Sequence, residues 1–372
     1  MSGTTIIAGQ VLTPAGFAPG RLHCTAAIQR FEPSGDAPAN RFVLPGFIDL
    51  HVHGGAGADC MAGADAVRRM ARFHAGHGTT ALLATTVTAP RPDLLAAFRG
   101  IGAAIAAADE GSARILGVHL EGPFISPKAL GAQPPFAIAP DLDLVDELAA
   151  LAPIRVATMA PEIDPGGALL AHFSGRGVRA QIGHTTCSYA QARAALDAGA
   201  AGFTHLFNAM SGLHHRGAGA VGAALAHADR AELILDFVHV EEGAARVALR
   251  AIPDLYCVTD AVAATGMPPG AYRLGQHRIL KGEDAVRLAD GTLAGSVLTM
   301  DRALRNLLHL GLSLEQAARR CATLQAEYLG IEDRGRLAPG AVADVVVVDP
   351  EGRLEAVFIE GRPIEAPAVR GF

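Results

Sequence analysis

The most constraining feature of the sequence is a series of short apolar segments that alternate with longer, alanine-rich segments of helical period. Such alternation predicts repeated strand–helix units, in which parallel strands lie side by side under a cover of helices. Eight units favour closure into a (β/α)₈ TIM-like barrel of the α/β class. The strands are expected at residues 46–52, 79–85, 115–120, 154–159, 178–182, 202–206, 233–238 and 255–259, and helices at 64–75, 92–108, 189–198, 241–251 and within 300–329.

The two ends of the chain share a different pattern. Residues 1–42 and the stretch from 344 to 359 contain short apolar runs broken by glycine, proline and other turn residues, which is typical of β-strands. We therefore expect one small β-domain assembled from both termini, residues 1–42 and 335–372, beside a barrel at 43–334.

Composition narrows the function. The chain has 31 basic and 37 acidic residues and no long run of either sign, so it lacks the electrostatic footprint of a nucleic-acid-binding protein. It also lacks a basic leader followed by an apolar stretch, and a run of about eighteen apolar residues. Its five cysteines form no CxxC pair, which argues against a disulfide framework. We expect a cytoplasmic protein that acts on a small molecule, without nucleic-acid or membrane partners.

Polar side chains gather where the predicted strands end, and this is where a barrel of this kind carries its active site. The first strand ends Asp49-Leu50-His51-Val52-His53. Because side chains alternate along a strand, His51 and His53 share one face. Two imidazoles in this arrangement can bind one divalent ion, although an HxH motif alone does not distinguish ligands from buried structural histidines.

Four further ligand-type residues end other strands: Glu121, His184, His205 and Asp260. Surface polar residues have no reason to recur at equivalent strand ends. Two histidines and a carboxylate are the usual ligands of a catalytic metal that keeps a position open for water, and Glu121, His184 and His205 supply this set. Asp260 is then placed to contact the metal and to act as the catalytic general base.

Longer motifs surround these residues: PGFIDLHVHG at 45–54, HLEGPF at 119–124, GHT at 183–185, THLFNAM at 204–210 and LAGS at 293–296. Over nearly the whole chain they resemble the N-acetylglucosamine-6-phosphate deacetylases of the amidohydrolase superfamily. The resemblance implies a metal-dependent hydrolase of amino-sugar metabolism that converts N-acetylglucosamine 6-phosphate to glucosamine 6-phosphate and acetate. It also implies a homodimer and a β-sandwich-like form for the small domain.

The resemblance further implies that the substrate phosphate is bound by Asn208, the backbone at Ala209, Arg216 and His239. In that family the arginine at the position of Arg216 comes from the neighbouring subunit. The sequence departs from the family pattern nearby, because Gly-Ala-Gly follows Arg216 where Glu-Pro-Gly is usual, and Phe-Val precedes His239 where a glycine is common.

Gln133 is the sharpest departure. Counting from the well-matched Glu121 places it where relatives carry a histidine that is taken to polarise the substrate carbonyl. Glutamine can donate one amide N–H there, but it cannot become cationic as negative charge develops on the oxygen. We expect Gln133 to contact the substrate and to stabilise the transition state less well. The sequence does not distinguish a natural shift toward another acyl sugar from an engineered residue.

The sequence leaves the number and identity of the ions open. Many amidohydrolases bridge two metals with a carboxylated lysine at the end of strand four, but the only lysines here are Lys128 and Lys281. Glu121 is then the natural shared ligand. One ion at Glu121, His184 and His205 is expected, and a second would be held by His51, His53, Glu121 and Asp260. Zinc is the first choice, with iron, cobalt and manganese as alternatives that suit the same ligands.

Two other functions stay open. One is an amidohydrolase that acts on a different N-acyl amino sugar or another N-acyl amine, and the other is a metal-bearing sugar-phosphate-binding protein with little turnover. Asn208 and Arg216 favour a phosphorylated substrate. A general base at Asp260 favours turnover over simple binding.

Overall fold

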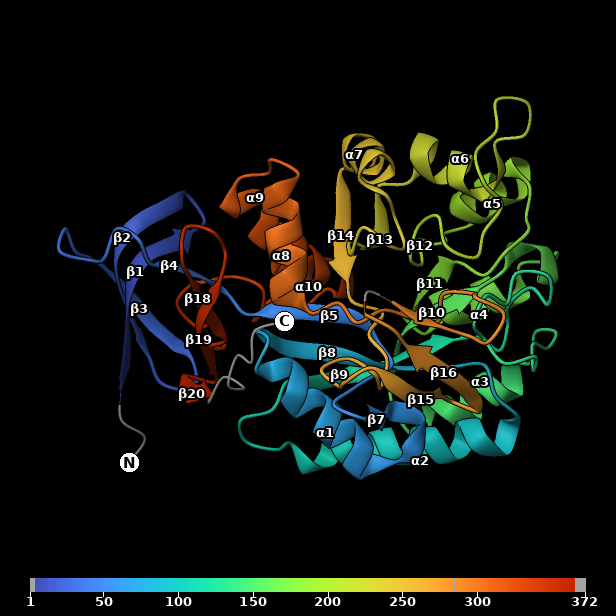
Figure 1. Cartoon of the computed structure of the whole chain (residues 1–372), viewed down its shortest axis with the longest axis horizontal. Coiled ribbons are helices and arrows are strands. Elements are labelled where there is room, and N and C mark those ends of the chain that lie inside the picture. Colours follow the sequence, from blue (N-terminus) through green and yellow to red (C-terminus); the bar gives the residue numbers. More distant parts are fainter. Residues whose placement is uncertain (1–3, 284, 365–372) are drawn as a thin grey trace.

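The computed structural model describes residues 4–283 and 285–364. Figure 1 shows a small β-domain, in blue and red, beside a larger body of strands and helices. Eight neighbouring parallel strands run through the larger body. In spatial order they are β5 (Phe47–Val52), β8 (Thr79–Thr86), β9 (Arg114–Glu121), β10 (Ile154–Met159), β11 (Arg179–Ile182), β12 (Gly202–Phe203), β13 (Arg230–Ile234) and β14 (Asp254–Val258).

Contacts between the first and last of these strands close the barrel. The backbone N–H of Asp260 donates to the carbonyl of His51 at 2.8 Å, and Val52 and Ala261 form a parallel bridge. The predicted (β/α)₈ barrel is thus confirmed. Its closure brings His51, from one end of the barrel sequence, next to Asp260 from the other.

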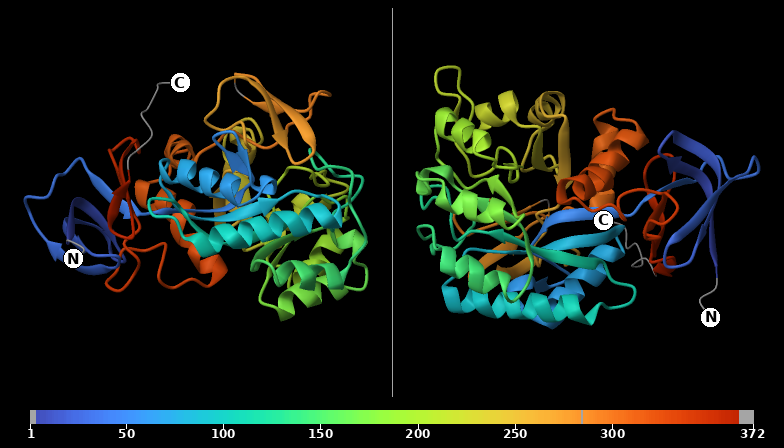
Figure 2. Two further views of the ribbon diagram at one scale, coloured as in Figure 1. Left: turned by 90° about the horizontal axis from the view of Figure 1, so that it is seen from below. Right: turned by 180° about the vertical axis from the view of Figure 1, so that it is seen from behind.

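Helices cover the outside of the barrel, as the two views of Figure 2 show. In α1 the buried residues Val67, Met70, Ala71 and His74 recur at spacings of three and four, so one face packs on the strands. The helices are α1 (Ala64–Ala75), α2 (Arg91–Ala107), α3 (Leu142–Ala149), α4 (Ala168–Gly175), α5 (Tyr189–Asp197), α6 (Gly219–His227), α7 (Glu242–Ala251), α8 (Met300–His309), α9 (Leu314–Ala318) and α10 (Leu324–Leu329), with short helical turns at Cys60–Ala62, Pro161–Ile163 and Arg319–Thr323.

Two barrel strands differ from the expected ranges by more than one residue at an end. The seventh was predicted at 233–238, but β13 spans Arg230–Ile234, and the chain then turns through Phe237 in the left-handed region at φ 63°. β13 begins three residues earlier than expected and includes the charged residue Glu232, which is fully buried. A barrel strand can bury such a residue when its side chain finds a partner in the lumen. β12 ends at Phe203 instead of 206, because the chain turns at His205, where φ is 29°.

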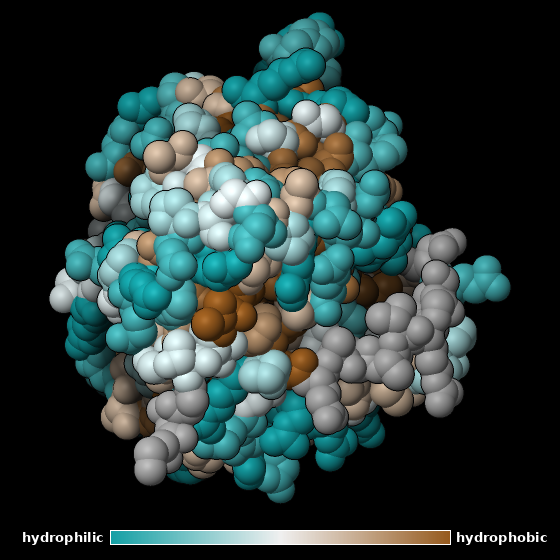
Figure 3. Space-filling model, turned by 90° about the vertical axis from the view of Figure 1, so that its left-hand side faces the viewer, coloured by the Kyte–Doolittle hydropathy of each residue, from teal (hydrophilic) through white to brown (hydrophobic). Residues whose placement is uncertain are grey.

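The small domain is one seven-stranded sheet with strands from both ends of the chain, as predicted. Residues from both ends, including Ile7, Leu22 and Val345, build its separate core. Hydrophilic residues cover much of the face seen in Figure 3. In spatial order the strands are β20 (Arg362–Ile364), β19 (Leu354–Ile359), β18 (Val345–Val348), β4 (Phe42–Pro45), β1 (Thr5–Thr13), β2 (Gly16–Cys24) and β3 (Ile28–Pro33).

The small sheet extends beyond the expected domain limit at residue 42. β4 belongs to the small sheet, so that sheet continues past residue 42 to Pro45. Residues 1–3 and 365–372, at the outer ends of the expected small domain, lie outside the described residues. The division at 42 and 335 stays a prediction.

A further antiparallel sheet, which the sequence did not reveal, follows β14. It contains β15 (Gly270–Leu274), β16 (His277–Lys281) and β17 (Val286–Arg287), and Figure 2, left, shows it in orange on one side of the barrel. A short hairpin, β6 (Gly54–Gly55) with β7 (Ala58–Asp59), follows β5. Within the described ranges, every helix is too short or too polar to cross a membrane.

Candidate metal centre

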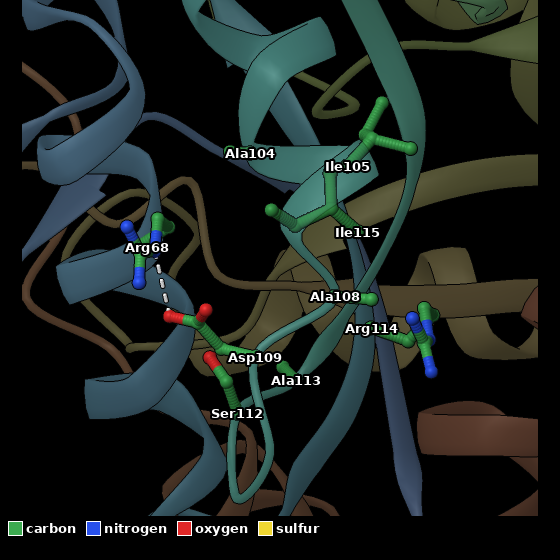
Figure 4. Close-up of a pocket in the computed structure, with 9 residues that line it drawn as sticks. All are labelled: Arg68, Ala104, Ile105, Ala108, Asp109, Ser112, Ala113, Arg114 and Ile115. Atoms are coloured by element: carbon green, nitrogen blue, oxygen red, sulfur yellow. Dashed lines mark hydrogen bonds and ion pairs between the residues drawn. The ribbon is translucent and has the colours of Figure 1, made fainter.

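A cavity of about 210 Å³ opens at the C-terminal ends of the barrel strands, and we call it the strand-end cavity. A second hollow lies between α1, α2 and β9 (Figure 4). Its volume of about 20 Å³ admits little more than one water molecule, and Arg68 Nε there donates to Asp109 Oδ2 at 2.7 Å. The strand-end cavity is therefore the candidate site, lined by His53, Glu121, Gly131, Ala132, Gln133, His184, His205, Asn208, Ala209, His239, Asp260, Leu274, Thr292, Leu293 and Gly295.

Three predicted ligands meet at the floor of the cavity, and we call them the Glu121 cluster. Glu121 ends β9, while His184 and His205 follow β11 and β12. Glu121 Oε1 lies 3.1 Å from His184 Nε2 and 2.9 Å from His205 Nε2, and the two Nε2 atoms are 3.0 Å apart. All three side chains are buried, so the group is a compact set of donors shielded from solvent.

His51, His53 and Asp260 form the adjoining Asp260 cluster. Asp260 Oδ1 lies 3.1 Å from His53 Nε2 and 3.5 Å from His51 Nε2, and those two nitrogens are 3.2 Å apart. The carboxylate of Glu121 lies between the clusters, because its Oε2 is 3.2 Å from His53 Nε2 and its Oε1 3.4 Å from His51 Nε2. One carboxylate is thus shared by four imidazoles.

Backbone strain accompanies the strand-end ligands. His184, His205 and Asp260 have φ values of 46°, 29° and 49°, in the left-handed region that side chains other than glycine seldom adopt. Each such residue costs about 1–3 kcal/mol, which the surrounding barrel must offset. The sharp bends let side chains at the ends of neighbouring strands point toward one common centre.

The donor set fits a divalent metal ion. It offers imidazole nitrogens and carboxylate oxygens, and its pairs of facing Nε2 atoms need a proton or an ion between them. Burial would lower the pKa of His53, but hydrogen bonds to Asp260 and Glu121 raise it to about 9. The centre is therefore built to hold positive charge, and protons compete there with a metal.

Gln133 is buried beside these clusters, 7% exposed, in the loop after β9. Its Oε1 accepts from the backbone N–H of Thr88 at 2.7 Å, and this bond directs the amide nitrogen toward Glu121, to which it donates. Gln133 therefore contacts the shared ligand carboxylate directly. That contact was not foreseen, because the sequence suggested only a substrate partner.

His119 and Glu232 lie beneath the ligands. His119 faces Leu50 O at 3.0 Å and Thr158 Oγ1 at 2.8 Å, so both ring nitrogens are engaged, and burial lowers its pKa to about 4. Glu232 Oε2 lies 2.9 Å from His51 Nδ1. Sequence reasoning missed Glu232 because the expected strand began one residue later; the available signal was a lone carboxylate inside the run Ala-Glu-Leu-Ile.

The predicted phosphate-binding residues are only partly brought together. Asn208, Ala209 and His239 line the strand-end cavity, whereas Arg216 is exposed and lies outside that lining. Burial would lower the pKa of His239, but the Asp236 carboxylate, 2.7 Å from its Nδ1, raises it above its ordinary value. A single chain therefore brings three of the four predicted phosphate-binding residues to the cavity, without its predicted arginine.

Comparisons with known proteins identify related chains. The family model of the amidohydrolase family matches residues 42–364. The chain is 37% identical to an N-acetylglucosamine-6-phosphate deacetylase from Lysinibacillus sphaericus over 332 residues, 87% of this chain and 86% of that protein. It is also 37% identical over 347 residues to an N-acetylgalactosamine-6-phosphate deacetylase from Escherichia coli O157:H7, with 91% of each chain covered.

A solved structure matches over nearly its full length. It is a mutant of the N-acetyl-D-glucosamine-6-phosphate deacetylase from Mycobacterium smegmatis in complex with N-acetyl-D-glucosamine-6-phosphate. The TM-score is 0.90 at 34% sequence identity, and the match covers 97% of this chain and 99% of that one. The likeness therefore includes the small domain as well as the barrel.

Proposed function

The chain belongs to the amidohydrolase family, and we propose that it hydrolyses the acetamide of N-acetylglucosamine 6-phosphate to glucosamine 6-phosphate and acetate. The observation that carries this proposal is the convergence of the Glu121 cluster and the Asp260 cluster on one cavity. The named relatives make this an enzyme of amide hydrolysis. They favour turnover over a sugar-phosphate-binding protein.

The mechanism follows from the chemistry of an amide, which resists attack by neutral water. A divalent ion at Glu121, His184 and His205 would lower the pKa of a water molecule and polarise the acetamide carbonyl. Asp260, at the wall of the cavity, accepts the proton of the attacking water and then passes it to the leaving sugar nitrogen. Gln133 bonds Glu121 through one amide N–H, and its second N–H would donate toward the carbonyl oxygen.

Several finer assignments belong to this proposal. The ion is zinc, with iron, cobalt or manganese as alternatives, and a second ion at His51, His53, Glu121 and Asp260 is supported by the shared position of Glu121. The substrate phosphate meets Asn208, the backbone of Ala209 and His239. The enzyme works as a cytoplasmic homodimer.

N-acetylgalactosamine 6-phosphate is the second candidate substrate. One relative is named for its deacetylation and matches this chain at the same 37% identity as a relative named for the glucosamine compound. The two sugars differ only in the orientation of the hydroxyl at C4. The acetamide chemistry described above is the same for both.

An acetate-release assay tests the function. The substrates are N-acetylglucosamine and N-acetylgalactosamine, each with and without a 6-phosphate. We expect the highest kcat/KM on N-acetylglucosamine 6-phosphate. A higher value on the galactosamine phosphate would move the assignment to the second candidate, while no acetate from any of them would contradict the deacetylase proposal.

Arg216→Ala is expected to raise KM for the 6-phosphorylated substrate by about tenfold or more and to leave the unphosphorylated analogue nearly unaffected. A charge-assisted hydrogen bond contributes about 1.5–3 kcal/mol, and about 1.4 kcal/mol is tenfold in affinity. Steady-state kinetics on the two substrates measure the split. The matched control is Arg193→Ala, which removes an exposed arginine paired with Asp197. An equal loss on both substrates would show that the phosphate pocket has been rebuilt.

Mixed dimers show which subunit supplies Arg216. Consider a dimer of one Arg216→Ala chain and one Asp260→Asn chain. If Arg216 acts across the interface, the site of the Arg216→Ala chain keeps its own Asp260 and receives Arg216 from the other chain, so one site is complete. An arginine acting within its own chain completes neither site. Because Arg216 lies outside the cavity of its own chain, we expect near-normal KM and about half the activity of the wild-type dimer.

Gln133→His is expected to raise turnover of N-acetylglucosamine 6-phosphate by roughly tenfold or more. Losing an oxyanion donor costs about 10²- to 10³-fold in kcat, and a neutral amide should recover only part of that. Initial rates of acetate release compare the variant with the wild type, and Gln133→Ala serves as the control with no donor. A histidine variant that is no faster would mean that Gln133 acts on Glu121 alone, or that the natural substrate is another acyl sugar.

A further inference from the structure

Glu232 is a fully buried carboxylate in the lumen of the barrel, on β13. Its Oε2 accepts a hydrogen bond from His51 Nδ1 at 2.9 Å and another from the backbone N–H of His205 at 3.2 Å. His51 belongs to the Asp260 cluster and His205 to the Glu121 cluster. One carboxylate therefore contacts a member of each.

These two contacts do not explain Glu232 as a residue that stabilises the fold. Burying a carboxylate costs several kcal/mol unless its oxygens are well paired. Within the described residues, Glu232 Oε1 has no hydrogen-bond partner, and His119 Nδ1 is 3.9 Å away from it. An apolar side chain of similar volume would fill this space at lower cost, so the carboxylate points to a role in the site.

The bond to His51 decides which ring nitrogen is available. Because the carboxylate accepts from Nδ1, that nitrogen carries a proton, and Nε2, which faces His53, Glu121 and Asp260, is the nitrogen left to bind an ion. The bond to His205 acts on the backbone instead. Glu232 accepts from the backbone N–H of His205, whose φ of 29° is strained. This bond helps to hold that backbone conformation, which sets the direction of the His205 side chain.

We propose that Glu232 is a positioning residue of the metal centre, which holds His51 and His205 in ligating geometry and so links the two clusters. This inference rests on the proposed function, because it assumes that an ion binds there. Removing a hydrogen-bond partner of a ligand histidine typically costs about 10- to 100-fold in metal affinity.

The test compares Glu232→Met, Glu232→Gln and a control, Gln181→Met. Methionine removes the acceptor, whereas glutamine keeps an oxygen and loses only the charge. Gln181 lies in the same lumen and donates to Tyr256 and Tyr328 instead of a ligand histidine. Metal-free proteins are titrated with Zn²⁺ against a chelating indicator, and with Co²⁺, whose visible spectrum reports ligand geometry. Thermal unfolding checks that each variant folds.

We expect the weakest Zn²⁺ affinity measured for Glu232→Met to be at least about tenfold lower than the weakest affinity of the wild type. The Co²⁺ spectrum of this variant should also differ from that of the wild type. Glu232→Gln should lose less, and Gln181→Met should match the wild type. Wild-type affinities and spectra in both Glu232 variants would overturn the proposal, as would an equal loss in Gln181→Met. If the wild type releases acetate and binds metal, and the Glu232 variants bind metal as the wild type does, this inference fails while the proposed function stands. A wild type that binds no ion would overturn both.

Discussion

Replacing Asp260 by asparagine is expected to lower kcat by at least about 10²-fold while leaving the fold and substrate KM nearly unchanged. Asparagine has almost the same shape, but its carboxamide cannot accept the proton of the attacking water. Among the described residues, Asp260 and Glu121 are the two carboxylates that line the cavity. Asp260 Oδ1 lies 3.1 Å from His53 Nε2. Glu121 is surrounded by imidazoles and is the poorer candidate for the base.

Saturating kinetics and metal content together measure this effect. Metal content is needed because Asp260 also contacts the ligands of its cluster, and a variant that lost its ion would be slow for a different reason. Asp301→Asn is the matched control, since it removes a largely buried carboxylate that pairs with His77 outside the cavity. Turnover close to that of the wild type in a metal-loaded Asp260→Asn protein would place the base elsewhere.

Glu121→Gln should have an effect at least as large, with loss of the ion and a fall in kcat on the order of 10³-fold. The carboxylate contacts imidazoles of both clusters and the amide of Gln133. Burial would raise the pKa of Glu121, but His51 and His184 hold it well below its usual range, so the variant removes a negative charge. Lewis-acid activation supplies several kcal/mol, and about 4 kcal/mol corresponds to about 10³-fold in rate.

Elemental analysis of the purified proteins checks this prediction. We expect at least about one equivalent of a divalent transition metal in the wild type and far less in Glu121→Gln. Chelation should abolish wild-type activity, and added metal should restore it. A wild-type protein with well under half an equivalent, and with activity that resists chelation, would contradict the metal assignment.

Part of the site could be predicted because its positions follow from local pattern. Apolar periodicity locates strands and helices, and a closed parallel barrel brings all C-terminal strand ends to one rim. Residues such as Glu121, His184 and Asp260 therefore converge wherever the strands themselves are correctly placed. Their ligand chemistry depends on residue type alone, and the sequence shows it directly.

Tertiary structure alone decided the rest, because it depends on partners far away in the chain. Glu232 can be buried only because His51, 181 positions earlier, meets it across the lumen, and a lone carboxylate within an apolar run does not by itself reveal that partner. The amide of Gln133 turns toward Glu121 because Thr88 holds its oxygen. Arg216 was expected to bind the substrate phosphate, yet the fold leaves it outside the cavity of its own chain. Residue type and spacing thus determined the barrel and the polar side chains that meet at its rim, whereas packing across the barrel decided how each side chain is held.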